Sequence, residues 1–146
     1  MPYVVAQFVG LLLVAWPWSG QWPTPLALLG WLPSLGLALW SLWCNPPGNF
    51  RIRPVPHPKG RLVCTGPYRY IRHPMYASLL LFALGCVLGY LSLASILAAV
   101  LLWVVLWAKA RREEQQLLRQ FSAYRDYRVR TGFFLPSGCG RSARDR

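Results

Sequence analysis

The distribution of charge constrains this chain more than any other feature of its sequence. Residues 1–50 and 73–108 contain no Lys, Arg, Asp or Glu, and all 16 Lys and Arg residues lie in two blocks, 51–72 and 109–146. A soluble protein distributes charge over every exposed helix face, whereas a bilayer excludes charge from its spans and leaves it in the loops on one side. The pattern predicts an all-α, polytopic membrane protein.

The uncharged stretches predict a bundle of about four transmembrane helices. Residues 3–18 and 26–43 are two candidate spans, and the first reads as a retained helix because it lacks the basic start of a signal peptide. As one helix, residues 75–108 would measure about 51 Å, whereas a hydrocarbon core is about 30 Å thick. We therefore expect this run to fold back near residues 89–92 as a helical hairpin.

Small residues inside these spans predict close helix contacts. Gly30 and Gly36 flank Pro33 in the second span, and Gly85 and Gly89 are four residues apart before the expected turn of the hairpin. Small side chains let two helix backbones approach in a membrane. We expect the second and third spans to use these positions for packing.

The whole chain is predicted to be one membrane domain. It divides into two N-terminal spans (1–44), a basic aromatic loop (45–74), the hairpin (75–108), an amphipathic tail helix (109–136) and a disordered end (137–146). The positive-inside rule places the N-terminus, the loop and the C-terminus in the cytoplasm. The minimal four-span build favours a bacterial inner membrane. The basic blocks next to the spans favour contact with membrane lipid over nucleic acid. The sequence does not indicate an oligomeric state.

The tail is predicted to be a single helix. Leu117, Leu118, Phe121 and Tyr124 recur at helical spacing and give a narrow apolar stripe on an otherwise charged surface. Gly132 is expected to end this helix. Such a helix can lie on the membrane or cover a cavity between the spans.

Two short polar clusters are candidates for chemistry. Arg72 and His73 precede Pro74 at the expected start of the third span, where free backbone N–H groups can hold a carboxylate or phosphate. The alternative is a helix start whose arginine reaches the lipid headgroups. Glu113 and Glu114 lie just beyond the fourth span, where they could act on a ligand or merely offset neighbouring basic residues. Because they are about 100° apart on a helix, only one is expected to face a given pocket, and which one stays open.

The four cysteines do not suggest a metal site or a disulfide framework. Cys44, Cys64, Cys86 and Cys139 form no Cys-x-x-Cys pair. We expect no bound metal.

Two motifs separated by the hairpin resemble a known family. They are LVCTGPYRYIRHPMY at residues 62–76 and EEQQLLRQFSAYRDY at residues 113–127, followed by Pro136. Both are similar to motifs of the isoprenylcysteine carboxyl methyltransferase and phospholipid methyltransferase superfamily of integral membrane enzymes. The resemblance covers about residues 45–136.

The resemblance implies an S-adenosylmethionine-dependent methyltransferase acting on a lipophilic acceptor, such as an isoprenylcysteine carboxylate, an isoprenoid or a phospholipid amine. It implies catalytic roles for Arg72, His73 and Glu113, and an acceptor-orienting role for Lys109. The implied cofactor contacts are Gly60, Arg61, Leu62, Val63, Tyr68, His73, Pro74, Met75, Tyr76, and Glu113 or Glu114.

Two other functions remain open from the sequence. A membrane reductase would bind a nicotinamide cofactor in place of S-adenosylmethionine. In a non-catalytic membrane module or small-molecule carrier, Glu113→Gln and His73→Ala would leave every activity and ligand affinity unchanged. The chain contains no Gly-x-Gly-x-x-Gly, so a soluble Rossmann-type site is not expected.

Overall fold

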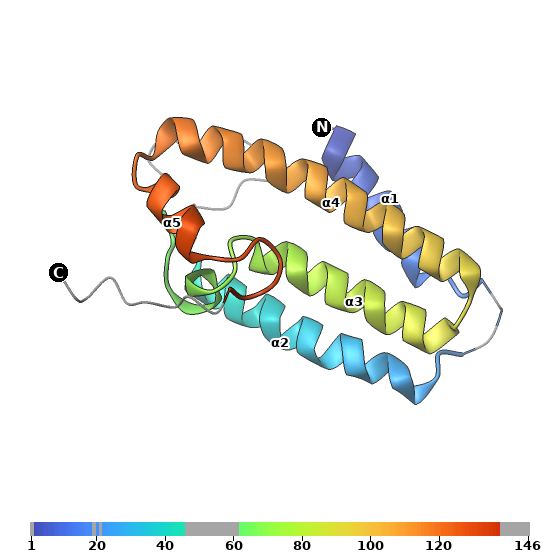
Figure 1. Cartoon of the computed structure of the whole chain (residues 1–146). Coiled ribbons are helices and arrows are strands. Elements are labelled where there is room, and N and C mark those ends of the chain that lie inside the picture. The colour runs from blue at the N-terminus through green and yellow to red at the C-terminus, as the bar shows by residue number, and fades with distance from the viewer. Residues whose placement is uncertain (1, 19, 21, 46–61, 138–146) are drawn as a thin grey trace.

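The computed structural model describes residues 2–18, 20, 22–45 and 62–137, and this part of the chain is helical (Figure 1). It contains α1 (Pro2–Ala15), α2 (Leu28–Cys44), α3 (Pro74–Tyr90), α4 (Leu93–Gln120) and α5 (Tyr124–Arg130). Short 3-10 turns, η1 (Pro25–Ala27) and η2 (Gly66–Arg69), lie before α2 and α3. No strand occurs among the described residues. The prediction of an all-helical chain is confirmed.

The helices are arranged as two packed pairs. The most extensive contacts are those of α2 with α3 and of α1 with α4, and α3 also packs on α4 (Figure 1). The short helix α5 lies where α2 ends and α3 begins, beside the last turns of α4. We call this end of the bundle the polar end, because the residues of both candidate clusters meet there.

Local sequence signals set the ends of α3 and α4. Pro74 is the first residue of α3, where its missing N–H is not needed. At the other end Leu91 adopts a left-handed conformation with φ of 46°, which terminates the helix. Ser92 then caps α4, because its hydroxyl oxygen accepts a hydrogen bond from the Ser95 amide at 3.1 Å. The uncharged run is therefore broken at residues 91–92, inside the interval that the sequence predicts.

Close backbone contact between α2 and α3 depends on glycine. A Cβ on Gly30 would collide with the backbone of Gly85 and with the Leu81 carbonyl, and a Cβ on Gly85 would lie 2.7 Å from the Ala27 carbonyl. The predicted packing role is thus confirmed for Gly30 and Gly85. It is wrong for Gly36, which has nothing within 4 Å of its Cβ position, because it faces away from α3.

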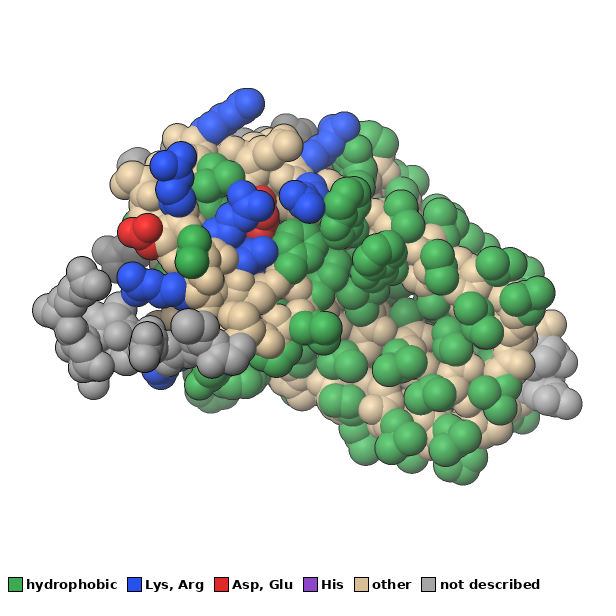
Figure 2. Space-filling view, viewed as in Figure 1, with side chains coloured by type: hydrophobic (Ala, Val, Ile, Leu, Met, Phe, Trp, Pro, Cys, Tyr) green, Lys and Arg blue, Asp and Glu red, His purple; other side chains and the backbone are tan. Residues whose placement is uncertain are grey.

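Two helices are long and apolar enough to cross a bilayer, namely Pro25–Cys44, which includes η1, and α4. Both α1, with 14 residues, and α3, with 17, are shorter than the roughly 20 residues that a span usually needs. Many large apolar side chains are nevertheless exposed along α1, α2 and α4, whereas Leu84 is the only large apolar side chain of α3 that is exposed. Figure 2 shows apolar side chains spread over the visible face of the bundle, with Lys and Arg gathered at the polar end. The number of spans and their orientation stay predictions.

The prediction of one continuous tail helix is wrong. The apolar part of α4, residues 93–108, continues without a break into the charged part as far as Gln120. Phe121 is extended, with φ of −123°, and a new helix, α5, begins at Tyr124. The break turns the Tyr124 side chain back into the protein, where only 1% of its surface is exposed. The expected disorder of residues 137–146 lies outside the described residues, apart from Ser137.

Candidate functional site

The loop before α3 is held in place by the segment that follows α5. We call residues 131–137 the closing segment. Ile71 and Gly132 form a parallel bridge, in which the Arg72 amide donates to the Gly132 carbonyl at 2.8 Å and the Gly132 amide donates to the Tyr70 carbonyl at 3.0 Å. The His73 amide donates to the Phe133 carbonyl at 3.3 Å. Because these are backbone hydrogen bonds, they fix the position of the loop with little dependence on side chains.

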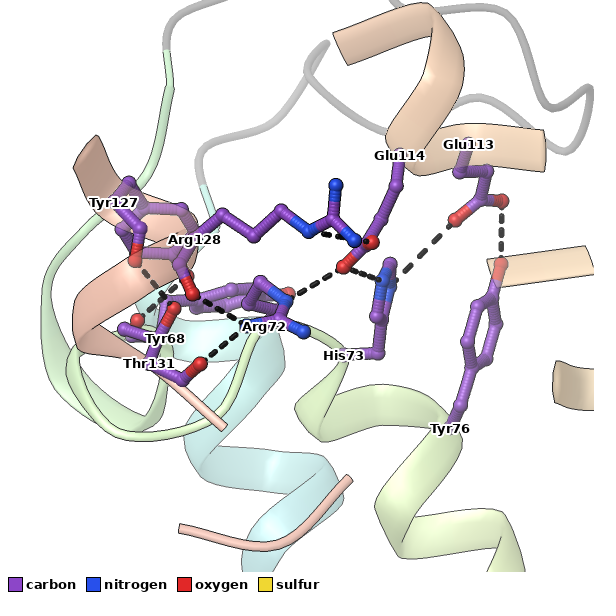
Figure 3. A network of polar contacts seen from close by, with 9 residues as sticks. All are labelled: Tyr68, Arg72, His73, Tyr76, Glu113, Glu114, Tyr127, Arg128 and Thr131. Carbon is purple, nitrogen blue, oxygen red and sulfur yellow. Dashed lines mark hydrogen bonds and ion pairs between the residues drawn. The ribbon is translucent and has the colours of Figure 1, made fainter. Parts of the chain in front are cut away.

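Arg72 joins the loop to α4 and to the end of α5. Its Nε donates to Oε1 of Glu114 at 2.5 Å, and its Nη1 donates to the carbonyls of Arg128 and Thr131 (Figure 3). Only 11% of the Arg72 side chain is exposed. It therefore does not extend to the lipid headgroups, and only Nη2 remains for the predicted contact with a cofactor carboxylate. That contact stays a prediction.

His73 lies between the two glutamates of α4 (Figure 3). Its Nε2 is 3.5 Å from Oε1 of Glu114, and its Nδ1 is 3.9 Å from Oε2 of Glu113. The expectation that only one glutamate can face a given pocket is therefore wrong for the space around His73. The Cα–Cβ bonds of Glu113 and Glu114 leave the helix in different directions, but their long side chains reach the two ring nitrogens of the same imidazole. Which of them would contact a cofactor stays open.

Aromatic rings complete the surroundings of His73. The Tyr76 ring stacks on the imidazole with centroids 5.6 Å apart, and the Phe133 ring meets it edge-on at 5.1 Å. His73 is consequently only 7% exposed. The imidazole is therefore enclosed by two carboxylates and two aromatic rings.

Glu113 faces a group of tyrosines. The Tyr76 hydroxyl donates to Oε1 of Glu113 at 2.5 Å. Tyr68 lies nearby: burial raises its pKa to about 12, and the negative charge of Glu113 adds to the rise. The Tyr127 hydroxyl donates to the Tyr68 carbonyl at 2.6 Å, which ties η2 to α5. The predicted cofactor residues Tyr68, Tyr76 and Glu113 are thus brought together.

Lys109 connects α1 to this group. Its Nζ donates to Oε1 of Gln7 at 2.7 Å and lies 5.0 Å from the centroid of the Tyr76 ring. Burial lowers the pKa of Lys109, and the negative charge of Glu113 works in the opposite direction. The Tyr76 ring therefore already has a cation near it, from the residue that the sequence predicts to orient an acceptor.

Glu114 is buried as an ion. Burial alone would raise the pKa of its carboxyl group, but contacts with His73 and Arg72 hold the pKa below its ordinary value. Arg128 adds a longer contact, with its Nε 3.5 Å from Oε2. The interpretation of Glu114 as mere balance for neighbouring arginines on a solvated turn is wrong, because the residue is 2% exposed and pairs with the distant Arg72.

The remaining predicted residues are only partly covered by the structure. Gly60 and Arg61 lie outside the described residues. Leu62 and Val63 are half-buried, Pro74 is buried and Met75 is half-buried in the first turn of α3. No described group of three or more His, Cys, Asp or Glu side chains could hold a metal ion.

Several residues of the site are missing from the sequence-based prediction. Arg128 reaches the site from α5, and Thr131 and Phe133 reach it from the closing segment. Nothing in the local sequence around these three residues indicates this. Gln7 was more accessible to prediction, because an amide inside an uncharged apolar segment is expensive to bury in a membrane without a partner.

Comparison with known proteins places the chain among methyltransferases. A family model described as phospholipid methyltransferase matches residues 26–124. The chain is 34% identical over 139 residues to the cobalt-zinc-cadmium resistance protein CzcN of Cupriavidus metallidurans, covering 91% of this chain and 61% of that protein. It is 32% identical over 123 residues to the nickel-cobalt-cadmium resistance protein NccN of Alcaligenes xylosoxydans xylosoxydans, covering 82% and 54%. The chain thus spans little more than half the length of these relatives. No solved structure matches it significantly.

Proposed function

We propose, because this chain belongs to the phospholipid methyltransferase family, that it transfers a methyl group from S-adenosylmethionine to a lipophilic acceptor at the membrane surface. Membership of the family makes it a membrane methyltransferase in general terms. The cofactor, the acceptor and the roles of single residues are our proposals.

The observation that carries the proposal is the position of His73 between Glu113 and Glu114 at the polar end. These residues come from motifs about 40 positions apart, and the Arg72–Glu114 pair and the Tyr76–Glu113 hydrogen bond hold the motifs together. The cluster follows directly on the apolar part of α4. A ligand from the water and a ligand from the bilayer can both reach such a position.

The residues present suit the proposed cofactor. The Glu113 side chain is 24% exposed, and its Oε2 lies 3.9 Å from His73 Nδ1, which is too far for a hydrogen bond. This oxygen can therefore accept a hydrogen bond from an amino group or a ribose hydroxyl. The Tyr76 ring accepts a cation, the Lys109 ammonium group 5.0 Å from its centroid, so a cofactor sulfonium would have to take the place of Lys109 to contact this ring. Tyr68, whose pKa the Glu113 charge helps to raise, supplies a second aromatic side chain near Glu113.

When bound, S-adenosylmethionine supplies a methyl group on a positively charged sulfur for in-line displacement. The chain's own contribution is to bind and align, since such a displacement depends mainly on the positions of its reactants. In this proposal Glu113, Tyr68 and His73 bind the cofactor, and Glu114 holds His73 in position. Lys109, oriented by Gln7, positions an anionic or polar group of the acceptor.

The acceptor is proposed to be lipophilic, because the site adjoins the exposed apolar surface of α4. An isoprenylcysteine-like carboxylate, an isoprenoid and a phospholipid amine all fit this description. The two relatives are named for resistance to metals. We propose no metal substrate from these names.

We propose a bacterial inner-membrane location, with both termini in the cytoplasm.

The test is calorimetric binding of S-adenosylmethionine and S-adenosylhomocysteine to the full chain purified in detergent. We expect Glu113→Gln and His73→Ala each to weaken binding about tenfold, which corresponds to the loss of one charge-assisted hydrogen bond. Asp126→Asn is the matched control, because it removes one carboxylate from an exposed position of α5. It should leave the affinity unchanged.

A labelled-methyl assay on bacterial lipid extracts then identifies the acceptor. If the folded wild type binds neither compound, the proposed cofactor is wrong. Binding of a nicotinamide dinucleotide in its place would indicate a reductase.

A further inference from the structure

A groove of about 600 Å³ lies beside the His73 cluster, and neither Tyr68 nor Tyr76 lines it. It runs between α3, the middle of α4 and the closing segment. The residues that matter here are basic at one end (Arg72, Arg111, Arg128) and apolar at the other (Leu80, Trp103, Trp107). None of the residue roles proposed above uses Arg111, Trp103, Trp107 or Leu80.

The basic end of the groove carries an excess of positive charge. Among the described residues that line it, Glu114 is the sole acidic one, against three guanidinium groups. Arg72 is engaged by Glu114 and by two backbone carbonyls. Arg128 has only the longer 3.5 Å contact with Glu114, and 41% of its side chain is exposed. Arg111 is exposed, and its guanidinium lies 5.1 Å from the centroid of the Trp107 ring. Arg111 and Arg128 are thus able to bind an anion.

The apolar end of the groove continues along α4. Trp103, Trp107 and Arg111 are spaced four residues apart, so they lie in line on one face of the helix. Trp103 is 48% exposed and Trp107 is 41% exposed. Tryptophan and arginine are the residues expected where a helix leaves the hydrocarbon for the headgroup layer. Along this line the surface changes from hydrocarbon-like to cationic within about two helical turns.

We infer that the groove binds an anionic membrane lipid. Its phosphate lies between Arg111 and Arg128, and an acyl chain lies along Leu80, Trp103 and Trp107. A free anion would contact only the basic end of the groove and would leave Trp103 and Trp107 without a role. A zwitterionic lipid would gain less binding free energy from the excess of guanidinium groups than an anionic lipid. Figure 2 shows basic side chains directly beside the apolar surface at this end of the molecule. The groove shares Arg72 and Glu114 with the His73 cluster, but the residues proposed to hold the lipid have no proposed role in methyl transfer.

The test is a lipid titration of the full chain in detergent, followed by native mass spectrometry. The probes are dioleoylphosphatidylglycerol, dioleoylphosphatidylcholine and inorganic phosphate. We expect the phosphatidylglycerol to bind at least tenfold more tightly than the phosphatidylcholine. Arg111→Gln with Arg128→Gln should weaken phosphatidylglycerol binding about 25-fold, or about fivefold for each arginine.

The matched control is Arg119→Gln with Arg125→Gln, which removes the same charge from exposed positions outside the groove. It should change the affinity less than twofold. An equal loss in both double variants would overturn the inference in favour of diffuse attraction, and equal binding of the two lipids would overturn it as well. Complete displacement of the lipid by millimolar phosphate would show an anion site that does not select lipid. If Arg128→Gln fails to fold, the single variant Arg111→Gln tests the inference, because the Arg111 guanidinium contacts the Trp107 ring on the exposed surface of α4. It should weaken phosphatidylglycerol binding about fivefold, and an unchanged affinity would overturn the inference.

Discussion

Arg72 and Glu114 form an ion pair of 2.5 Å that is almost excluded from water and joins the loop before α3 to α4. The two residues are 42 positions apart, and the pair is extended by backbone carbonyls of α5 and the closing segment. The ion pair therefore holds the two sequence motifs of the site together.

Replacing Arg72 should destabilise the protein strongly. Arg72→Met leaves the Glu114 carboxylate buried without its principal partner, which costs about 3 kcal/mol of unfolding free energy. Thermal unfolding in detergent measures this. The exposed Arg69→Gln should change stability by less than 0.5 kcal/mol, about the usual effect of a surface substitution. Additive losses in Arg72→Met with Glu114→Gln would contradict the pairing, because removing both partners should cost less than the sum.

Acid should destabilise the protein through Glu114. Its folded-state pKa lies below the ordinary value of 4.5, so ionised Glu114 stabilises the fold above that value. This stabilisation is lost as the pH falls from about 4.5 through the lower folded-state pKa. Melting temperatures measured from pH 7 to pH 3 should therefore decline on the acid side. Glu114→Gln should be less stable at pH 7 and show a shallower decline, and an unchanged acid slope would sink the assignment.

The Tyr76 hydroxyl should contribute through Glu113 alone. Tyr76→Phe keeps the ring that stacks on His73 but removes the donor to Glu113, at an expected cost of about 1 kcal/mol in stability. Denaturant unfolding in mild detergent checks this value. Tyr70→Phe, at a 40% exposed position, serves as the comparison and should have no effect. A larger loss for Tyr70→Phe than for Tyr76→Phe would contradict the contact.

The two glycines of α2 should respond in opposite ways to the same substitution. Gly30→Ala drives a methyl group into the backbone of α3 at Gly85, which should cost about 2 kcal/mol as overpacking. Gly36→Ala places its methyl group in open space and should be neutral or slightly stabilising, because alanine favours a helix. Melting temperatures of the two variants, measured side by side, test the helix crossing. Equal shifts would show that α2 and α3 do not meet at Gly30.

Much of the helical framework can be predicted from local sequence. Pro74 marks the start of α3, and the length of the uncharged run requires a break, which Leu91 and Ser92 provide. The two motifs could be paired only through a family resemblance, and the structure brings His73, Glu113 and Glu114 together. Local rules suffice wherever one residue decides the conformation of its own neighbourhood.

The remainder depends on contacts between distant segments. The end of α4 at Gln120 and the start of α5 have no proline or glycine to mark them, since the turn is made to bury Tyr124. The closing segment pairs with residues 70–73 through backbone groups, which leave no pattern in the side chains. The partners of Arg72 could not be foreseen for the same reason. Two of the three are carbonyl oxygens, which every residue has.

The continuity of α4 has a consequence for where catalysis takes place. Because no break separates Ala108 from Glu113, five residues of rigid helix raise the carboxylates only about 8 Å above the edge of the apolar part. In the proposed placement, with residues 93–108 in the hydrocarbon, the carboxylates would lie at the depth of the phosphate and glycerol groups of the surrounding lipids. A lipid acceptor would not need to be extracted into water before reacting. In the proposed enzyme, the rigid helix would fix the distance of the reacting groups from the hydrocarbon and so hold them at the water–lipid boundary.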